Sequence, residues 1–283
     1  MKSKPRVAIL LVLLTPALLN AMQLKPQTLK AWDAYARAAR VRMEARARGH
    51  GPFLWVDEEP DRLERVRGGE ILVEPGNDES PHSVPHGLVH DWMGAVFVAK
   101  ASLDEVTGVL NDYARYKDFY KPMVVRSRLL EQSADHEKVS LLMTQKAYSI
   151  IAAVETDDEV LEVTIDPARV YSLSTSVRVH EIADYGKPSE HALAEDNGPG
   201  YVWRTLTITR LEQRDGGVYI EMEMIALSRS IPLAFRWLVQ PLAEHLPRNI
   251  LAVTLRDTRD AVSQAIKQAP LNTQIVNKVD PRR

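Results

Sequence analysis

Two glutamates in an apolar segment have the clearest potential for acid–base chemistry. Glu221 and Glu223 alternate with methionines, so a β-strand over 218–227 places both carboxyls on one face and the methionines on the other. A carboxyl inside a cavity has a raised pKa and can act as a general acid or base, or pair with an arginine such as Arg178 or Arg204. If the same face meets water, the glutamates serve only solubility, and the sequence favours this second interpretation.

Aromatic side chains form a second group of candidates. Their rings supply apolar area, and a tyrosine hydroxyl can orient a ligand by a hydrogen bond. The same rings can instead fill the protein core. The residues that we expect to contact a ligand are Tyr113, Tyr116, Phe119, Tyr148, Tyr171, Arg178, Trp203, Glu221 and Glu223.

Motifs that would commit the chain to a reaction or a metal do not occur. His82, His86 and His90 are spaced by four, which aligns side chains on a helix, but Pro81 and Pro85 disfavour a helix there. The sequence contains no Gly-x-Ser-x-Gly, phosphate loop or dinucleotide fingerprint. We therefore assign no catalytic residue, no metal site and no cofactor.

Composition excludes several classes of protein. The 283 residues include no cysteine, which rules out disulfides, thiolate nucleophiles, iron–sulfur clusters and cysteine zinc sites. The formal net charge is -2, with 45% hydrophobic and 26% charged residues, as in ordinary globular proteins. A nucleic-acid partner would need a dominant basic face, so we expect none.

The N-terminus has the pattern of an export signal. A basic start with Lys2, Lys4 and Arg6 precedes an apolar run over 7–19 and then Ala21. The apolar run is shorter than the roughly 20 residues of a membrane-spanning helix. We predict a signal peptide over 1–21 and a periplasmic or secreted protein, with an uncleaved N-terminal anchor as the alternative.

Three regions are predicted to follow the signal. Residues 22–85 combine an amphipathic helix, rich in arginine, with a Pro/Gly-rich linker. That helix either packs on the main domain or lies on an anionic membrane surface as a peripheral contact. Residues 86–269 form the main domain, and residues 270–283 form a disordered tail.

The main domain is predicted to be α+β. A capping box at Ser102 and Glu105 starts a helix, and period-two alternation indicates strands over about a hundred residues. Asp215-Gly216 predicts a tight hairpin turn, and a helix between Pro247 and Pro270 closes the domain. The predicted strands are 94–99, 123–131, 138–146, 149–156, 160–166, 173–182, 201–212 and 218–227.

The segment 110–122, Leu-Asn-Asp-Tyr-Ala-Arg-Tyr-Lys-Asp-Phe-Tyr-Lys-Pro, followed by a strand, resembles one in the START, polyketide-cyclase and coenzyme-Q-binding superfamily. The resemblance covers about residues 90–268 and extends to exported bacterial members. It implies the helix-grip (START-like, SRPBCC) fold, in which a curved antiparallel sheet wraps a long C-terminal helix around a cavity. It implies no reaction, since one fold hosts many functions.

The leading functional hypothesis is an exported, non-catalytic carrier of a small hydrophobic ligand, lipid-like or polyketide-like. The first alternative is a cyclase, dehydratase or hydrolase that uses Glu221 or Glu223 with a tyrosine or His180. The second is an envelope-associated interaction protein with a solid core and no ligand. A buried carboxyl in the cavity favours the enzyme, and the lack of any cavity favours the interaction protein.

Overall fold

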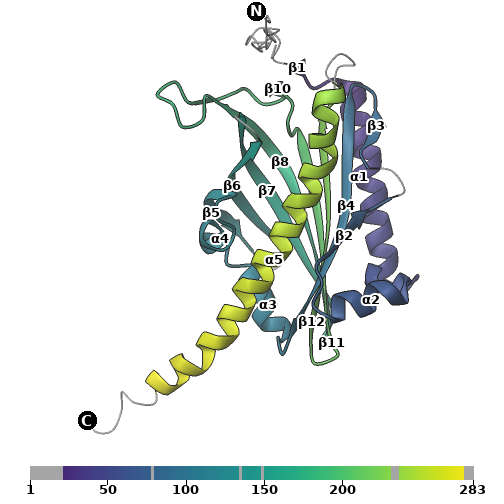
Figure 1. Ribbon diagram of the computed structural model, residues 1–283, viewed down its shortest axis with the longest axis vertical. Helices are drawn as coiled ribbons and strands as arrows, with labels where there is room; N and C mark the ends of the chain where they lie inside the picture. The colour runs from purple at the N-terminus through teal and green to yellow at the C-terminus, as the bar shows by residue number, and fades with distance from the viewer. Residues whose placement is uncertain (1–21, 78–79, 134–135, 148–149, 231–235, 277–283) are drawn as a thin grey trace, which may run out of the picture.

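The computed structural model describes residues 22–276 except 78–79, 134–135, 148–149 and 231–235 (Figure 1). The helices are α1 (Pro26–Ala47), α2 (Pro60–Arg67), α3 (Leu103–Leu110), α4 (Tyr116–Phe119) and α5 (Arg236–Val276), with short 3-10 turns η2 (Trp55–Glu58) and η3 (Tyr113–Arg115). The strands of the main sheet are β2 (Leu72–Pro75), β3 (His82–Val84), β4 (Gly87–Ala99), β5 (Val124–Gln132), β6 (His136–Ala147), β7 (Ile150–Asp166), β8 (Arg169–Ala183), β9 (His191–Ala192), β11 (Arg204–Arg214) and β12 (Gly217–Arg229). A separate short pair joins β1 (Met22–Gln23) to β10 (Asn197–Gly198).

The main sheet is antiparallel, and its strands follow the order β2-β4-β12-β11-β8-β7-β6-β5. The predicted hairpin is confirmed: Arg214 pairs with Gly217, and Asp215 and Gly216 adopt φ of 56° and 77° between them. A two-residue loop with positive φ at both positions matches the twist of the flanking strands. The turn therefore fixes the register of β11 against β12.

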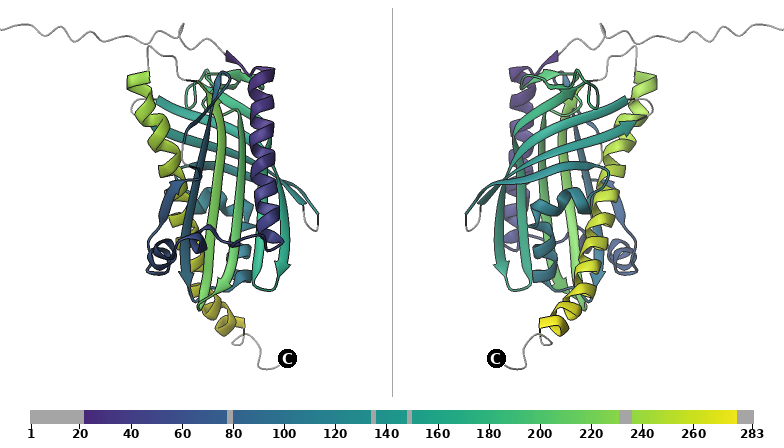
Figure 2. Two further views of the ribbon diagram at one scale, coloured as in Figure 1. Left: turned by 90° about the vertical axis from the view of Figure 1, so that its right-hand side faces the viewer. Right: turned by 90° about the vertical axis from the view of Figure 1, so that its left-hand side faces the viewer.

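The two long helices lie on opposite sides of the sheet (Figure 2). On one side, α1 buries Trp32 and Met43 in a cluster with Leu206 and Ile225. On the other side, α5 buries leucines against residues of β4 and β12 that point the opposite way. Successive strand residues alternate between the faces, so one sheet supports two separate apolar cores.

Helix α5 approaches β4 closely at Gly94. A Cβ there would lie 2.6 Å from Cδ1 of Leu255 and 3.0 Å from Cδ2 of Leu251. Both leucines are fully buried. The glycine thus lets the helix approach the sheet more closely than any side chain would allow.

This architecture confirms the α+β helix-grip fold predicted from the sequence. The capping box is confirmed as well: Glu105 N donates to Ser102 Oγ, and Ser102 N donates to the Glu105 carboxylate. Among the described residues, no helix is long and apolar enough to cross a membrane.

Several strand ends differ from the prediction by a few residues, and three differences are larger. The two strands expected over 149–156 and 160–166 are one strand, β7, because its Asp-Asp-Glu segment stays extended between β6 and β8. The Pro/Gly-rich segment before residue 85, which was predicted to be a linker, contains strand β2, and β2 pairs with β4 at the sheet edge. Helix α5 extends beyond Pro247 and Pro270, although each proline removes a backbone hydrogen-bond donor.

The N-terminal segment shares its core with the sheet. Side chains of α1 and of residues 53–56 belong to one buried cluster with β4, β11 and β12. The domain boundary at residue 85 stays a prediction, but the residues before it pack directly on those after it. The predicted signal peptide over 1–21 lies outside the described residues.

Candidate functional site

A cavity of about 200 Å³ lies on the α5 side of the sheet. Residues from α3, η3 and α4 cover one part of it, and Ile250 and Thr254 of α5 contribute another wall. Strands β6, β7, β8, β11 and β12 provide the floor. The cavity therefore lies between the sheet and the helices, where the helix-grip fold leaves space.

Methionine and aliphatic side chains make half of the cavity lining. Met123, Met143, Met222 and Met224 all line the cavity. The prediction that Met222 and Met224 share a strand face is confirmed, and that face is the one that meets the cavity. Thioether side chains adapt to irregular shapes, so this wall suits an apolar ligand without a rigid outline.

Three tyrosines pack against one another, tilted or edge-on, along the helical side of the cavity. The ring centroids of Tyr113 and Tyr116 lie 5.1 Å apart, and those of Tyr116 and Tyr120 lie 5.0 Å apart. Burial raises the pKa of Tyr120 to about 12, and it also raises the pKa of Tyr113 and Tyr116, so the phenols stay neutral. The Tyr120 and Thr258 hydroxyls lie 3.0 Å apart, which ties this row to α5.

Small hydroxyl side chains form a polar strip on the floor. Thr207 pairs across the strands with Ser174, and Thr209 pairs with Ser172. All four line the cavity. They can exchange hydrogen bonds with a ligand that carries oxygen or nitrogen, while their small size leaves the space open.

One buried carboxyl, Asp158 of β7, also lines the cavity. It is 6% exposed, and the Thr156 hydroxyl donates to its Oδ2 at 2.6 Å. Burial raises the pKa of Asp158 to about 6; the Thr156 hydrogen bond lowers it and the neighbouring Asp157 raises it. Sequence reasoning missed this residue, because the predicted strands over 149–156 and 160–166 left the acidic triplet between them.

Glu221 and Glu223 lie on the opposite side of the sheet, under α1. Glu221 accepts hydrogen bonds from the backbone N–H groups of Trp55 and Val56 at 2.9 and 2.8 Å. Arg210 contacts Glu223 at 2.6 Å and Glu221 at 3.5 Å. Both glutamates are buried, so the water-facing interpretation is wrong, and so is their placement in a cavity.

The arginines expected to pair with these glutamates have other partners. Arg178 Nε donates to Asp157 at 2.8 Å, and Arg204 Nη1 donates to Asp196 at 2.7 Å. The true partner, Arg210, follows from the hairpin register, because the Asp-Gly turn sets Arg210 opposite Glu221. Counting back from that turn would have found the pair.

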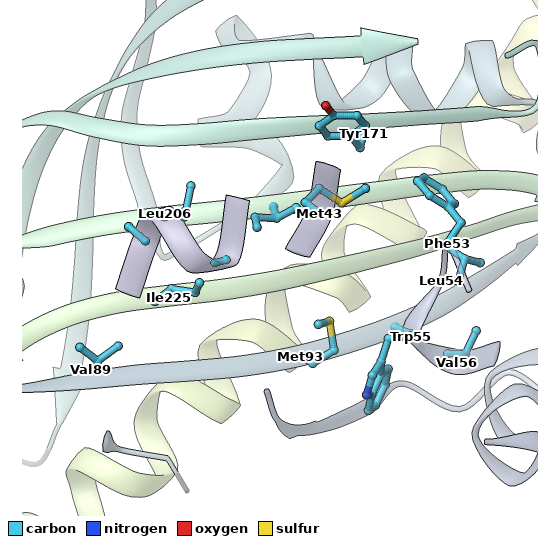
Figure 3. Close-up of a cluster of buried hydrophobic side chains, with 14 of the residues drawn as sticks. Met43, Phe53, Leu54, Trp55, Val56, Val89, Met93, Tyr171, Leu206 and Ile225 are labelled. Atoms are coloured by element: carbon cyan, nitrogen blue, oxygen red, sulfur yellow. The ribbon is translucent and has the colours of Figure 1, made fainter. Parts of the chain in front are cut away.

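Two further aromatic candidates belong to the α1-side core. Tyr171 lies near Met43 and Phe53 in this cluster (Figure 3). Trp203 is 4% exposed in the same cluster. Neither lines the cavity, because each points to the α1 face of the sheet.

Of the remaining candidates, Tyr113 and Tyr116 do line the cavity, and their contact with a ligand stays a prediction. Phe119 packs instead against the α5-side core, edge-on to Tyr120 at 6.4 Å. His180 Nδ1 lies 2.8 Å from the Leu193 carbonyl oxygen, away from the cavity. Tyr148 lies outside the described residues.

Within the described part of the chain, no three His, Asp or Glu side chains gather as a metal site requires. His82 lies in β3 and His90 in β4, with His86 in the turn between them. His90 Nε2 lies 2.8 Å from the Ser228 hydroxyl.

No protein-family model matches the chain, and neither does any curated protein. Several solved structures are similar in fold. A STAR-related lipid transfer protein fragment from Xanthomonas axonopodis is 19% identical with a TM-score of 0.44, over 69% of this chain and 99% of that one. The ZhuI aromatase/cyclase from Streptomyces sp. R1128 is 17% identical with a TM-score of 0.43, over 64% of this chain and 96% of that one. Human StAR-related lipid transfer protein 5 is 14% identical with a TM-score of 0.44, over 74% of this chain and 93% of that one.

Proposed function

We propose that this protein binds a small hydrophobic ligand in the cavity between its sheet and α5, and that it does so outside the cytoplasm. The observation that carries the proposal is the cavity itself, about 200 Å³ in volume and lined mainly by methionine, aliphatic and tyrosine side chains. An unfilled apolar space forfeits dispersion contacts, so a ligand that fills it stabilises the protein.

The volume limits the ligand. An apolar cavity of about 150 Å³ binds benzene, so this one holds a single ring system or a short chain segment. A longer ligand would extend through the opening of the cavity. The floor hydroxyls at Ser172, Ser174, Thr207 and Thr209 would orient its polar atoms.

Export and membrane contact are part of the proposal. The basic, apolar and small-residue pattern over 1–21 supports a periplasmic or secreted location. On α1 the apolar stripe is buried against the sheet, while Lys30 and Arg37 remain exposed; Arg48, just after the helix, pairs with Glu44 at 3.1 Å. An exposed basic row supports a peripheral approach to anionic lipid without insertion of the helix.

Native mass spectrometry tests the binding function directly. We expect the purified protein to carry an apolar adduct, either from its host or after incubation with a membrane lipid extract. Ser174→Trp fills the cavity floor and should abolish the adduct. Val177→Trp adds the same bulk at an exposed position of β8 and should retain it. A persistently unliganded mass, or an adduct that survives in S174W, would contradict the proposal.

A second candidate, catalysis in the same cavity, is favoured by Asp158. Its raised pKa of about 6 suits a general acid or base near neutral pH. Tyr113 and Tyr116 share the cavity and would supply ring contacts, while the Tyr116 hydroxyl donates to the Leu110 carbonyl. If catalysis occurs, an extracted ligand should be converted by the wild-type protein and remain unchanged with Asp158→Asn.

A further inference from the structure

The charges that line the cavity have one sign. Asp158 and Glu162 both face it, and no lysine, arginine or histidine does so among the described residues. An anionic ligand such as a fatty acid would therefore meet carboxylates without a compensating cation. This asymmetry selects against anionic ligands and in favour of neutral or cationic ones.

Asp158 lies beside the tyrosine row. Its cross-strand partner is Val139, and its same-face neighbour along β7 is Val160. Both valines form one buried cluster with Tyr113, and Tyr116 packs against that cluster. Side chains at paired or alternate positions of a sheet lie within reach of one another. The carboxyl thus borders the aromatic wall of the cavity.

The nearest charged neighbours do not neutralise this carboxyl. Asp157 lies on the other face of β7, where it pairs with Arg178 at 2.7 Å. Glu162, on the same face as Asp158, accepts from Asn111 Nδ2 at 3.2 Å. A buried carboxylate without a cation is costly, and a ligand that brings a positive charge would remove that cost.

We propose that the cavity selects an apolar amine, whose protonated nitrogen pairs with Asp158 beside the Tyr113 and Tyr116 rings. An ammonium group gains a charge-assisted hydrogen bond from the carboxylate and a favourable interaction with aromatic faces. The apolar body of the ligand contacts the methionine wall. The inference rests on the cavity-binding function proposed above and names its ligand class.

Three probes with one body test the inference: 4-phenylbutylamine, 4-phenylbutanol and 4-phenylbutyrate, each titrated calorimetrically into the purified protein. A charge-assisted hydrogen bond predicts that the amine binds about tenfold to a hundredfold more tightly than the alcohol. The carboxylate should bind more weakly than both. Asp158→Asn should lower the affinity for the amine to that for the alcohol and leave the alcohol unchanged, which also verifies that the variant folds.

Glu162→Gln is the matched control, because it removes the other cavity carboxylate and should preserve most of the preference for the amine. Equal affinities for amine and alcohol in the wild-type protein would overturn the inference and leave the binding function standing. Loss of the preference in E162Q but not in D158N would also overturn it. If none of the three probes binds, both the inference and the cavity-binding function fall.

Discussion

Asp158→Asn should make the protein more stable at neutral pH, which is the reverse of what most buried substitutions do. The pKa of Asp158 rises from 3.8 to about 6 on folding, chiefly because burial disfavours the charged form. A folded-state pKa above the unfolded one means that the carboxylate destabilises the fold above about pH 6. That cost declines as the pH falls through 6 and is gone below the unfolded pKa.

The magnitude follows from the shift. Each pKa unit corresponds to about 1.4 kcal/mol, so a shift of about two units gives a cost of about 3 kcal/mol at pH 7.5. Asparagine has the same shape without the charge, and its amide oxygen can still accept the Thr156 hydrogen bond. In a protein of this size each kcal/mol moves Tm by roughly 2–4 °C, so D158N should melt several degrees higher.

Thermal unfolding of both proteins at pH 4.5, 6.0 and 7.5 measures this effect. The difference in Tm should be largest at pH 7.5 and small at pH 4.5. Asp157→Asn is a control at the adjacent residue, where the expected change in stability has the opposite sign. Burial raises the pKa of Asp157, but hydrogen bonds from Arg178 and Ser140 outweigh burial, so the pKa of Asp157 is lowered on balance. D157N should therefore destabilise at pH 7.5. A D158N protein that melts lower than wild type at pH 7.5 would refute the reasoning.

Three further substitutions test the contacts on the two sheet faces. Arg210→Met leaves buried Glu221 without a cation and leaves Glu223 with only half-exposed Arg42, at 3.1 Å, so urea denaturation should show a loss of about 3 kcal/mol. A loss below about 1 kcal/mol would mean that Arg210 contributes little to the packing of α1 and η2 on the sheet. Gly94→Ala forces a Cβ into the α5 leucines and should cost about 1–3 kcal/mol, whereas Gly108→Ala in α3, with open space around it, should stabilise by about 0.5–1 kcal/mol. Equal effects of the two alanines would contradict the close approach of α5.

The sequence predicted those parts of the fold that local patterns determine. The capping box at Ser102 and the Asp215-Gly216 turn each specify backbone geometry through a few neighbouring residues, and both are confirmed. The alternation in β12 correctly separated glutamates from methionines. Alternation cannot tell which face meets α1 and which meets the cavity, because that depends on helices distant in the sequence. The assignment of Glu221 and Glu223 to the cavity failed for this reason.

Asp158 was missed for a different reason. An Asp-Asp-Glu triplet usually marks a turn, since acidic residues have low strand propensity. In β7 it stays extended because β6 and β8 pair with it on both sides, with a register shift between Asp157 and Asp158. The two adjacent carboxyls thus reach opposite faces: one meets Arg178, and the other meets the cavity. Tertiary pairing outweighed local propensity at the residue on which the proposed ligand class depends.

Both faces of the sheet bury carboxyls with a raised pKa, but only Asp158 borders the cavity, and this difference favours a binding role for the α5 side. Under α1, Arg210 bonds Glu223, and Glu221 also accepts two backbone hydrogen bonds. Burial raises the pKa of Asp91 on this side to about 6 as well, and Tyr35 and Asn77 of the protein itself donate to Asp91 Oδ2 in the same network. A ligand there would have to break it. On the α5 side, Asp158 has a raised pKa and borders an apolar space. Among the described residues, no lysine, arginine or histidine lines the cavity to pair with its carboxylate. The carboxyls under α1 lie among protein side chains, whereas Asp158 borders open space, so an incoming cation can reach Asp158 without breaking an existing ion pair.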